Sequence, residues 1–397
     1  AYMDRYGYRS RHSSYVLGFW AWAHMRLGQW SEAVGVWEQL RRYGNMLVEG
    51  KALYWQAYAL EKLGEQKQAQ AKLAVLRSRY GVTYYGMLGE QLLARINGRD
   101  ARASQVWWPE GSGTANDQPR KSIDQFPAAR LNAAQRKSWE RVKLLVALDE
   151  REHARDALNP IYNTLIALVP PADRDAWIHA LGYYVGDYNR MWQVATGGSI
   201  SAMPSVPDPK ALRTAMAYPR AYKEIVLETT AEFELPPELM WSIMRQESRY
   251  KPGAISATDA VGALQMIPAT ARLVAADLGI SYDVRTFFRP EVGFRYSAFY
   301  MRKLLDTYSG LFVPMASSYN TGPGPIARWF KKNPDAEFAW LIEEFEYNEG
   351  RNYGRKIAEH MLRYLYLYEA DAVRRGALLD QMFPLSRDIE IASDVGY

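Results

Sequence analysis

Residues 236–247 read PPELMWSIMRQE, and this stretch has the pattern of an amphipathic helix that ends in a carboxylate. Two prolines favour a helix start, and the apolar residues that follow recur at helical spacing. They are Leu239, Met240, Ile243 and Met244. Glu247 continues the same face. A carboxylate on the buried side of a helix is either ion-paired or raised in pKa, and a raised pKa suits a general acid. From this helix alone, both interpretations stay open.

The same helical texture extends over the rest of the chain, and no stretch alternates as a strand would, so the sequence predicts an all-α fold. Leu27-Gly28 recurs as Leu63-Gly64, and Ala33 recurs as Ala69, each 36 residues later. A small Ala lets two helices approach closely, and Gly relieves the backbone at a helix end. This tetratricopeptide-like pattern predicts an α-superhelix (solenoid) over most of residues 1–200.

Two Gly- and Pro-rich stretches punctuate the chain, at residues 111–119 and 197–209. The first predicts a loop and the second a linker between domains. We therefore predict a superhelical domain with its linker over residues 1–205, a compact helical domain over 211–375 and a C-terminal tail over 376–397. The sequence assigns no function to that tail.

Composition excludes several classes of function. The 397 residues include no Cys, so disulfides, thiol nucleophiles and Cys-bound metals are excluded. No run approaches the roughly 18 apolar residues of a membrane-crossing helix. The net charge of +5 is not gathered into a dense basic tract, and no phosphate-binding Gly loop or His pair at metal-ligand spacing occurs. We expect no metal, cofactor, nucleotide or nucleic acid. The start at Ala1, without Met, favours a processed form of a longer precursor.

Several motifs resemble, in order, spacing and residue type, those of the soluble lytic transglycosylases. They are the segment 245–250 (RQESRY), Ser256, the segment 261–268 (VGALQMIP), the segment 318–324 (SYNTGPG) and the segment 349–353 (EGRNY). The third departs from the family pattern, because Gly-Ala-Leu-Gln stands where Gly-Leu-Met-Gln is usual. Upstream, Tyr84-Tyr85-Gly86 resembles a recurrent element of the family's helical superstructure. The resemblance implies a goose-type-lysozyme-like catalytic domain after the superhelix.

By the same resemblance, Glu247 is a single catalytic acid/base, and Ser248 helps to orient it. Glu247 would cleave the β-1,4 bond between N-acetylmuramic acid and N-acetylglucosamine and form a 1,6-anhydro product, without consuming water. The residues expected to contact substrate or to line the site are Ser248, Ser256, Gly262, Gln265, Met266, Tyr300, Tyr319, Asn320, Glu349 and Tyr353. For Tyr300 a core position is an equal alternative, and for Glu349 an ion-paired surface position is.

Two other functions remain open at this point. Asp259, twelve residues after Glu247, would serve as the base that activates water if the enzyme were a hydrolysing lysozyme. Alternatively, the helical array is an interaction scaffold and the second domain only binds glycan.

The expected partners are peptidoglycan glycan strands, together with a cell-wall protein that binds the superhelix. The substrate implies the periplasm of a Gram-negative bacterium, with outer-membrane association as one option. If the superhelix guides glycan strands, cleavage should proceed from strand ends and release small disaccharide-type fragments.

Overall fold

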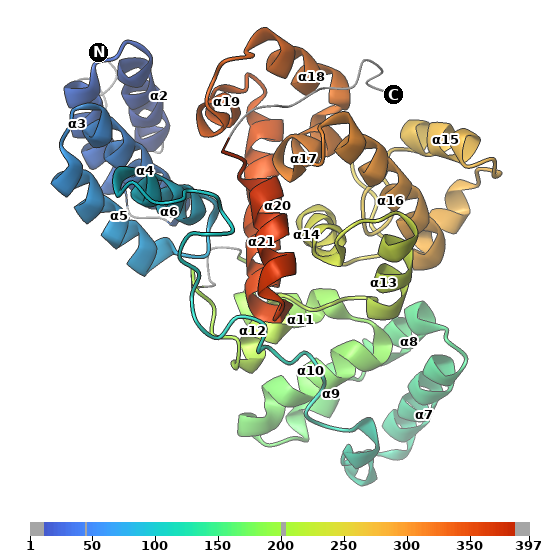
Figure 1. Ribbon diagram of the computed structural model, residues 1–397. Coiled ribbons are helices and arrows are strands. Elements are labelled where there is room, and N and C mark those ends of the chain that lie inside the picture. Colours follow the sequence, from blue (N-terminus) through green and yellow to red (C-terminus); the bar gives the residue numbers. More distant parts are fainter. Residues whose placement is uncertain (1–11, 44–45, 200–203, 386–397) are drawn as a thin grey trace. The chain divides into compact units, whose positions relative to one another are not determined.

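The computed structural model describes residues 12–43, 46–199 and 204–385, and within these ranges the chain is built from helices and loops without a named strand (Figure 1). Two isolated antiparallel bridges, at Ile255–Val261 and Val261–Met266, shape one loop. The all-α prediction is confirmed. In the described part of the chain, no helix combines the length and apolarity needed to cross a bilayer.

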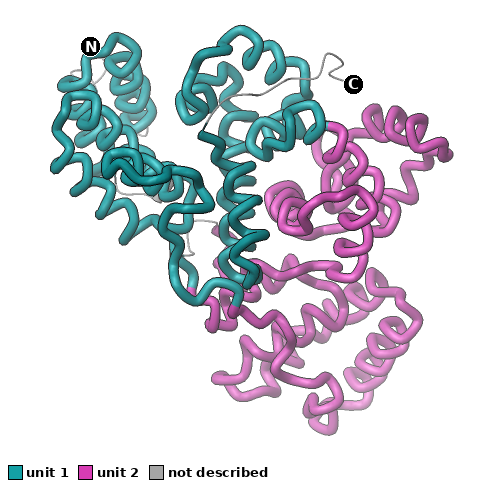
Figure 2. Tube along the Cα trace, in the orientation of Figure 1, with its two compact units in different colours: residues 1–113, 204–207, 304–396 teal, residues 114–203, 208–303, 397 magenta. Residues whose placement is uncertain are grey.

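The chain folds into two compact units (Figure 2). Unit 1 holds residues up to 113, residues 204–207 and residues from 304 onward, and unit 2 holds 114–203 and 208–303. The predicted domain boundaries near 205, 211 and 375 stay predictions.

Unit 1 begins with helices that pack on one another in chain order. They are α2 (Ser13–Arg26), α3 (Trp30–Arg41), α4 (Met46–Lys62), α5 (Gln66–Tyr80) and α6 (Tyr84–Ile96). Gly28 and Gly64 have φ of +67° and +78°, a conformation that favours glycine. Ala33 and Ala69 are fully buried. The repeat seen in the sequence is therefore a repeat of helix pairs.

The second part of unit 1 centres on one long buried helix. It contains α17 (Phe312–Thr321), α18 (Pro323–Lys332), α19 (Phe338–Glu344), α20 (Asn348–Tyr368) and α21 (Ala372–Met382). Helix α20 packs against α17 and also contacts α6. Helix α21 falls mostly in the predicted tail and is tied to the first half of the unit, because the Ser104 amide donates to Asp380 Oδ1 at 2.9 Å.

Unit 2 holds shorter helices around two cores. In chain order they are η1 (Ile123–Gln125), η2 (Ala128–Arg130), α7 (Ala133–Ala147), α8 (Arg151–Leu158), α9 (Tyr162–Ala167), η3 (Pro171–Asp173), α10 (Arg174–Val185), α11 (Tyr188–Thr196), α12 (Leu212–Ala217), α13 (Lys223–Glu232), α14 (Pro237–Glu247), α15 (Pro268–Asp277), η5 (Val284–Phe288) and α16 (Pro290–Thr307), whose last residues belong to unit 1. Phe126, Trp139 and Trp177 anchor the core of α7–α10. Leu239, Met240, Ile243 and Met244 of α14 are fully buried and anchor the other.

Candidate active site

Helix α14 ends at Glu247, as the sequence pattern predicts. Its apolar stripe is fully buried, whereas Glu247 itself is half-buried. The buried stripe fixes the helix axis, and the last turn carries the carboxylate to the edge of the core. Glu247 is therefore held by a rigid element and is still open to a substrate.

Ser248 fixes the turn that follows Glu247. Its backbone caps α14, and its hydroxyl donates to the carbonyl oxygen of Ala263 at 2.7 Å and accepts from the Lys251 amide at 3.0 Å. Ser248 is 8% exposed. Its hydroxyl thus joins the end of α14 to the loop that carries Gly262 and Gln265. This geometry suits a residue that orients Glu247 better than one that contacts the sugar.

The loop 255–266 is folded back on itself by backbone hydrogen bonds. Val261 and Met266 exchange two of them, each 3.0 Å long. Gly262 has φ of +82°, and a Cβ there would lie 3.0 Å from the carbonyl oxygen of Phe287, so the position requires glycine. Gln265 also has positive φ, and its amide donates to the carbonyls of Ala254 at 3.1 Å and Gly262 at 2.8 Å. The loop is pre-ordered, and the Gln265 amide nitrogen serves the loop itself.

Three further predicted residues of unit 2 have structural contacts of their own. The Ser256 hydroxyl accepts from the Ala260 amide at 3.0 Å within the turn, and Met266 is 3% exposed. Tyr300 on α16 is 7% exposed, and burial raises its pKa to about 12. The Tyr300 hydroxyl therefore stays protonated near neutral pH and can donate a hydrogen bond. Asp259, the alternative base, is exposed in a turn at φ of +60°.

Unit 1 brings together the remaining predicted residues on two packed helices. Tyr319 and Asn320 lie in the last turn of α17, and Tyr353 lies on α20 and is 5% exposed. The Asn320 Oδ1 atom is buried, and no hydrogen-bond partner for it occurs among the described residues. Glu349, at the start of α20, is exposed. Asn320 thus offers a desolvated acceptor that a ligand hydroxyl or amide can satisfy.

Glycines allow these two helices to approach closely. A Cβ on Gly354 would lie 2.8 Å from the carbonyl oxygen of Val313 in α17, and one on Gly350 would collide with Thr321. Both glycines face α17 from α20, one turn apart. These close approaches hold α20 tightly against α17, and Tyr353 directly precedes one of them.

A buried ionic cluster of unit 1 was not predicted from the sequence. Glu343 of α19 is 4% exposed and pairs with Lys51 of α4 and with Arg355 of α20, the latter at 2.8 Å. The Tyr85 hydroxyl of α6 donates to Glu343 at 2.9 Å and accepts from Arg355 at 2.6 Å. Burial raises the pKa of Glu343, but the two cations outweigh it and lower that pKa to about 2.

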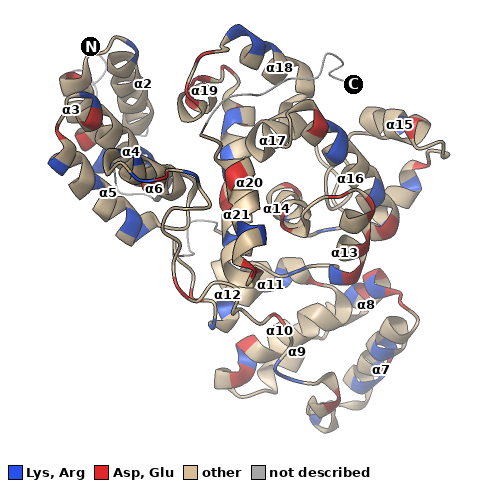
Figure 3. Ribbon diagram, in the orientation of Figure 1, with Lys and Arg blue, Asp and Glu red and all other residues tan. Residues whose placement is uncertain are grey.

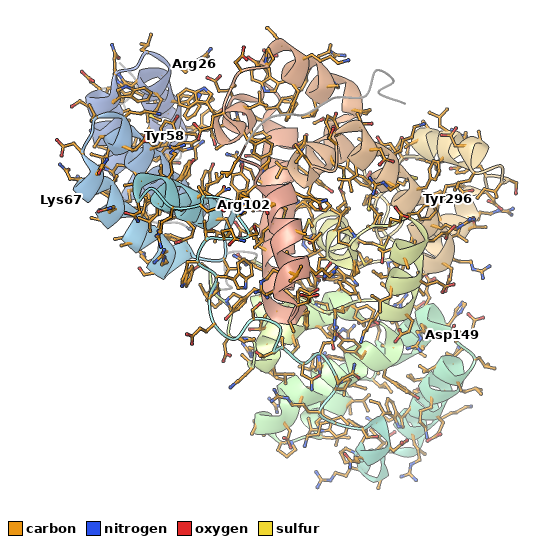
Figure 4. The ribbon with its side chains drawn as sticks, in the orientation of Figure 1. Arg26, Tyr58, Lys67, Arg102, Asp149 and Tyr296 are labelled. Carbon is orange, nitrogen blue, oxygen red and sulfur yellow. The ribbon has the colours of Figure 1, made fainter. Side chains whose placement is uncertain are left out.

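This cluster explains one motif of the sequence. Tyr84-Tyr85-Gly86 supplies Tyr85 to the cluster, and a Cβ on Gly86 would collide with the carbonyl oxygen of Tyr80. The resemblance drew attention to the motif, but nothing in the sequence indicated that its partners lie on α19 and α20. Nearby, Tyr58, labelled in Figure 4, donates to Glu337 at 2.9 Å. Helix α20 contains both acidic and basic residues along its length (Figure 3).

Within residues 12–43, 46–199 and 204–385, no group of three or more His, Asp or Glu side chains is arranged to hold a metal ion.

Comparisons with known proteins agree with this arrangement. Residues 224–342 match the model of the transglycosylase SLT domain, and residues 51–81 match a tetratricopeptide repeat. Membrane-bound lytic murein transglycosylase C from Actinobacillus pleuropneumoniae is 27% identical over 170 residues, which cover 37% of this chain and 47% of that protein. The repeat predicted from Leu27, Leu63 and their neighbours is thus confirmed.

Two solved structures share the fold over almost the whole chain. The 70-kDa soluble lytic transglycosylase from Escherichia coli matches with a TM-score of 0.60 and 19% identity, covering 91% of this chain and 54% of that one. An inactive glutamate-to-glutamine mutant of the lytic transglycosylase Slt from Pseudomonas aeruginosa matches with a TM-score of 0.59 and 20% identity, covering 95% and 53%. The chain spans about half the length of these proteins.

Proposed function

Because residues 224–342 match the transglycosylase SLT domain, we propose that the protein is a lytic murein transglycosylase with Glu247 as its single acid/base. The observation that carries the proposal is the position of Glu247, half-buried at the end of α14 and locked to the loop 255–266 through Ser248. The bond cleaved is the β-1,4 link between N-acetylmuramic acid and N-acetylglucosamine.

In the first half of the reaction, the Glu247 carboxyl donates its proton to the glycosidic oxygen, and the bond from this oxygen to the muramoyl C1 breaks. In the second half, the ionised carboxylate takes the proton of the muramoyl 6-hydroxyl while O6 attacks C1. A C1–O6 bond forms, Glu247 regains its proton and no water is consumed. One carboxylate is sufficient because the nucleophile belongs to the substrate and is already positioned. The 2-acetamido group would stabilise the charge that develops at C1.

The other residues fall into two roles in this proposal. Ser248, Gly262 and Met266 hold the loop beside Glu247, and Gln265 and Ser256 add the hydrogen bonds that keep it ordered. Tyr300, Tyr319, Asn320 and Tyr353 would contact the sugars, and the unsatisfied Asn320 acceptor supports that role. Glu349 would be a second carboxylate near the substrate. Its exposure is compatible with this role and equally with an ordinary surface position.

The place of action follows from the substrate. We propose that the protein works in the periplasm of a Gram-negative bacterium, with outer-membrane association as one option, and that the helical repeats guide glycan strands so that cutting proceeds from strand ends. A cell-wall protein partner on the superhelix belongs to the same proposal. Products dominated by disaccharide units from the first minutes would support cutting from the ends, and long fragments would contradict it.

The test is mass spectrometry of the soluble products released from purified peptidoglycan by the wild type, by Glu247→Gln and by Glu232→Gln. Glu232 is the matched control because it also ends a helix of unit 2. We expect muropeptides about 18 Da lighter than their hydrated forms, since intramolecular attack excludes water. They should vanish with Glu247→Gln and persist with Glu232→Gln.

Hydrated products would instead indicate attack by water and turn attention to Asp259 as the base. The absence of products from the wild type would favour the glycan-binding scaffold. Circular dichroism of Glu247→Gln would establish that a lost activity is not a lost fold. The inactive Pseudomonas aeruginosa mutant supports the choice of this substitution.

A further inference from the structure

The segment 217–222 (AYPRAY) leads from the end of α12 into α13, just ahead of residue 224, where the match to the transglycosylase SLT domain begins. Two of its backbone carbonyls accept hydrogen bonds from α14. The indole N–H of Trp241 donates to the Ala221 carbonyl at 2.9 Å, and Nε of Arg245 donates to the Ala217 carbonyl at 3.3 Å. The two donors are four residues apart, so they share one face of α14. The last turns of α14 are therefore fastened to this segment.

Arg245 is a buried cation that no carboxylate neutralises. It is 2% exposed, and in the described part of the chain no Asp or Glu forms an ion pair with it. Its guanidinium lies 4.3 Å from the centre of the Tyr218 ring and 5.9 Å from that of the Trp192 ring. A buried charge is costly unless other groups stabilise it, and here a carbonyl oxygen and two aromatic rings do so. These groups all precede residue 224, so Arg245 ties α14 to residues outside the matched domain.

The same segment also reaches the turn after Glu247. The Tyr222 hydroxyl donates to the Tyr250 carbonyl at 3.2 Å. Tyr250 is 1% exposed and has φ of +68°, and its amide donates to the Met244 carbonyl at 3.3 Å. A bulky residue seldom adopts this backbone conformation, so surrounding contacts must hold it. Glu247 therefore lies between two points of attachment, Arg245 before it and Tyr250 after it.

The segment is itself held in place. Arg220 forms a two-point ion pair with Asp117, which is 1% exposed, with Nε and Nη2 at 2.6 Å and 2.5 Å from the two carboxylate oxygens. The Tyr183 hydroxyl also donates to Asp117, at 3.4 Å. Two parallel hydrogen bonds fix the orientation of a group as well as its position. A segment anchored in this way can hold α14 in one position.

We propose that Arg245 is a positioning residue, and that the segment 217–222 is a brace that fixes the direction of the Glu247 carboxyl group through it. This inference rests on the proposed function, because it takes Glu247 as the acid/base. One carboxyl group must reach first the glycosidic oxygen and then the muramoyl 6-hydroxyl. A misplacement of about 1 Å can slow such a reaction by about a hundredfold. The brace therefore contributes to kcat.

The test is steady-state kinetics of the full chain on soluble peptidoglycan strands without cross-links, with release of anhydro products as the readout. Arg245→Met removes the guanidinium and keeps a long side chain, so it should lower kcat about tenfold or more while KM stays the same. Arg245→Lys keeps a cation near the Tyr218 ring and should recover part of this loss. Tyr222→Phe removes one hydroxyl and keeps the ring, so it tests the second attachment even if Arg245→Met folds poorly. It should lower kcat severalfold.

Leu165→Ala is the matched control. Leu165 of α9 is fully buried in the same unit, so the substitution creates a cavity and lowers stability without touching the brace. It should keep the kcat of the wild type below its Tm. Hydrogen exchange gives a readout besides activity. The amides of Ser248 and Tyr250 both donate to the Met244 carbonyl, and they should exchange faster in Arg245→Met than in Leu165→Ala or the wild type.

An unchanged kcat in both Arg245→Met and Tyr222→Phe would overturn the proposal, and so would an equal loss of kcat in Leu165→Ala. A raised KM with unchanged kcat would assign these residues to substrate binding and would overturn it too. Failure of the proposed function is distinguishable, because the wild type itself would then release no anhydro products. Hydrogen exchange would still report on the brace in that case, and wild-type exchange rates in Arg245→Met would refute it.

Discussion

Replacing Glu343 by Gln should destabilise unit 1 by about 3 kcal/mol at neutral pH. The substitution keeps the shape of the side chain but leaves Lys51 and Arg355, whose side chains are 24% and 13% exposed, without their anion. Breaking a buried pair from one side costs about 3–5 kcal/mol, because the remaining charge stays desolvated. The shift of the Glu343 pKa from 4.5 to about 2 corresponds to a similar free energy, about 3 kcal/mol.

Thermal and urea unfolding of the two proteins would measure this effect. For a unit of this size, a loss of about 3 kcal/mol lowers Tm by about 6–12 °C. Glu344→Gln is the matched control, because Glu344 pairs with Arg26, whose side chain is 66% exposed and is labelled in Figure 4. Because this cation is largely in solvent and screened, losing the pair should cost less than losing the Glu343 cluster. Hydrogen exchange should show faster exchange in α19 and α20 of the Glu343→Gln protein.

The dependence on pH gives the prediction a sign. The folded-state pKa of Glu343 lies below the ordinary value, so its stabilisation is fully present above about pH 4.5 and is lost as pH falls toward 2. The difference in stability between the wild type and Glu343→Gln should therefore shrink across this range. A difference below 1 kcal/mol at pH 7, or one independent of pH, would refute the role given to the cluster.

Other substitutions probe separate parts of the structure. Gly354→Ala should lower the free energy of unfolding by about 1–3 kcal/mol, because the added methyl group overpacks the contact between α20 and α17. Gly35→Ala should raise it by about 0.5–1 kcal/mol, because Gly35 is an exposed position of α3 with open space around it. Equal Tm shifts for the two variants would contradict this packing. Ser248→Ala should lower kcat while KM changes little, because it loosens the turn after Glu247 and leaves the substrate contacts in place; an unchanged kcat in steady-state kinetics would contradict the positioning role. Arg220→Met should cost about 3 kcal/mol in urea unfolding, because the two-point ion pair with Asp117, which is 1% exposed, loses its cation; a cost near zero would show that the pair is dispensable.

The sequence predicted those features of the fold that repeat or that follow a local rule. Helix periodicity with Gly28 and Gly64 at helix ends was sufficient for the repeats, and prolines 236 and 237 located the start of α14. The position of Glu247 followed from the same pattern. Local rules did not give the degree of its burial, because exposure at the last turn of a helix depends on what packs beyond it.

Contacts between distant segments were beyond the reach of the sequence. Lys51 and Glu343 are 292 residues apart, and no periodicity connects them. The same holds for Ser248, which was expected to orient Glu247, whereas its link to the Ala263 carbonyl depends on a loop that folds back onto α14. A Ser, a Glu or a Lys carries no sign of its partner until the chain has folded.

Contacts inside unit 1 indicate a structural role for the helical repeats. Tyr85 and Lys51 belong to the repeats. Tyr85 hydrogen-bonds to both Glu343 and Arg355, which flank the segment from α19 into α20, and Lys51 pairs with Glu343. Gln91 of α6 likewise donates to the carbonyl oxygen of Phe383, after α21, at 2.9 Å. Arg355 lies two residues after Tyr353, so the repeats stabilise the very turn of α20 that carries a proposed sugar contact. Removing the repeats would take Lys51 and Tyr85 away from Glu343 and leave Arg355 as its partner in this cluster, so the repeats are part of the structure that supports the site.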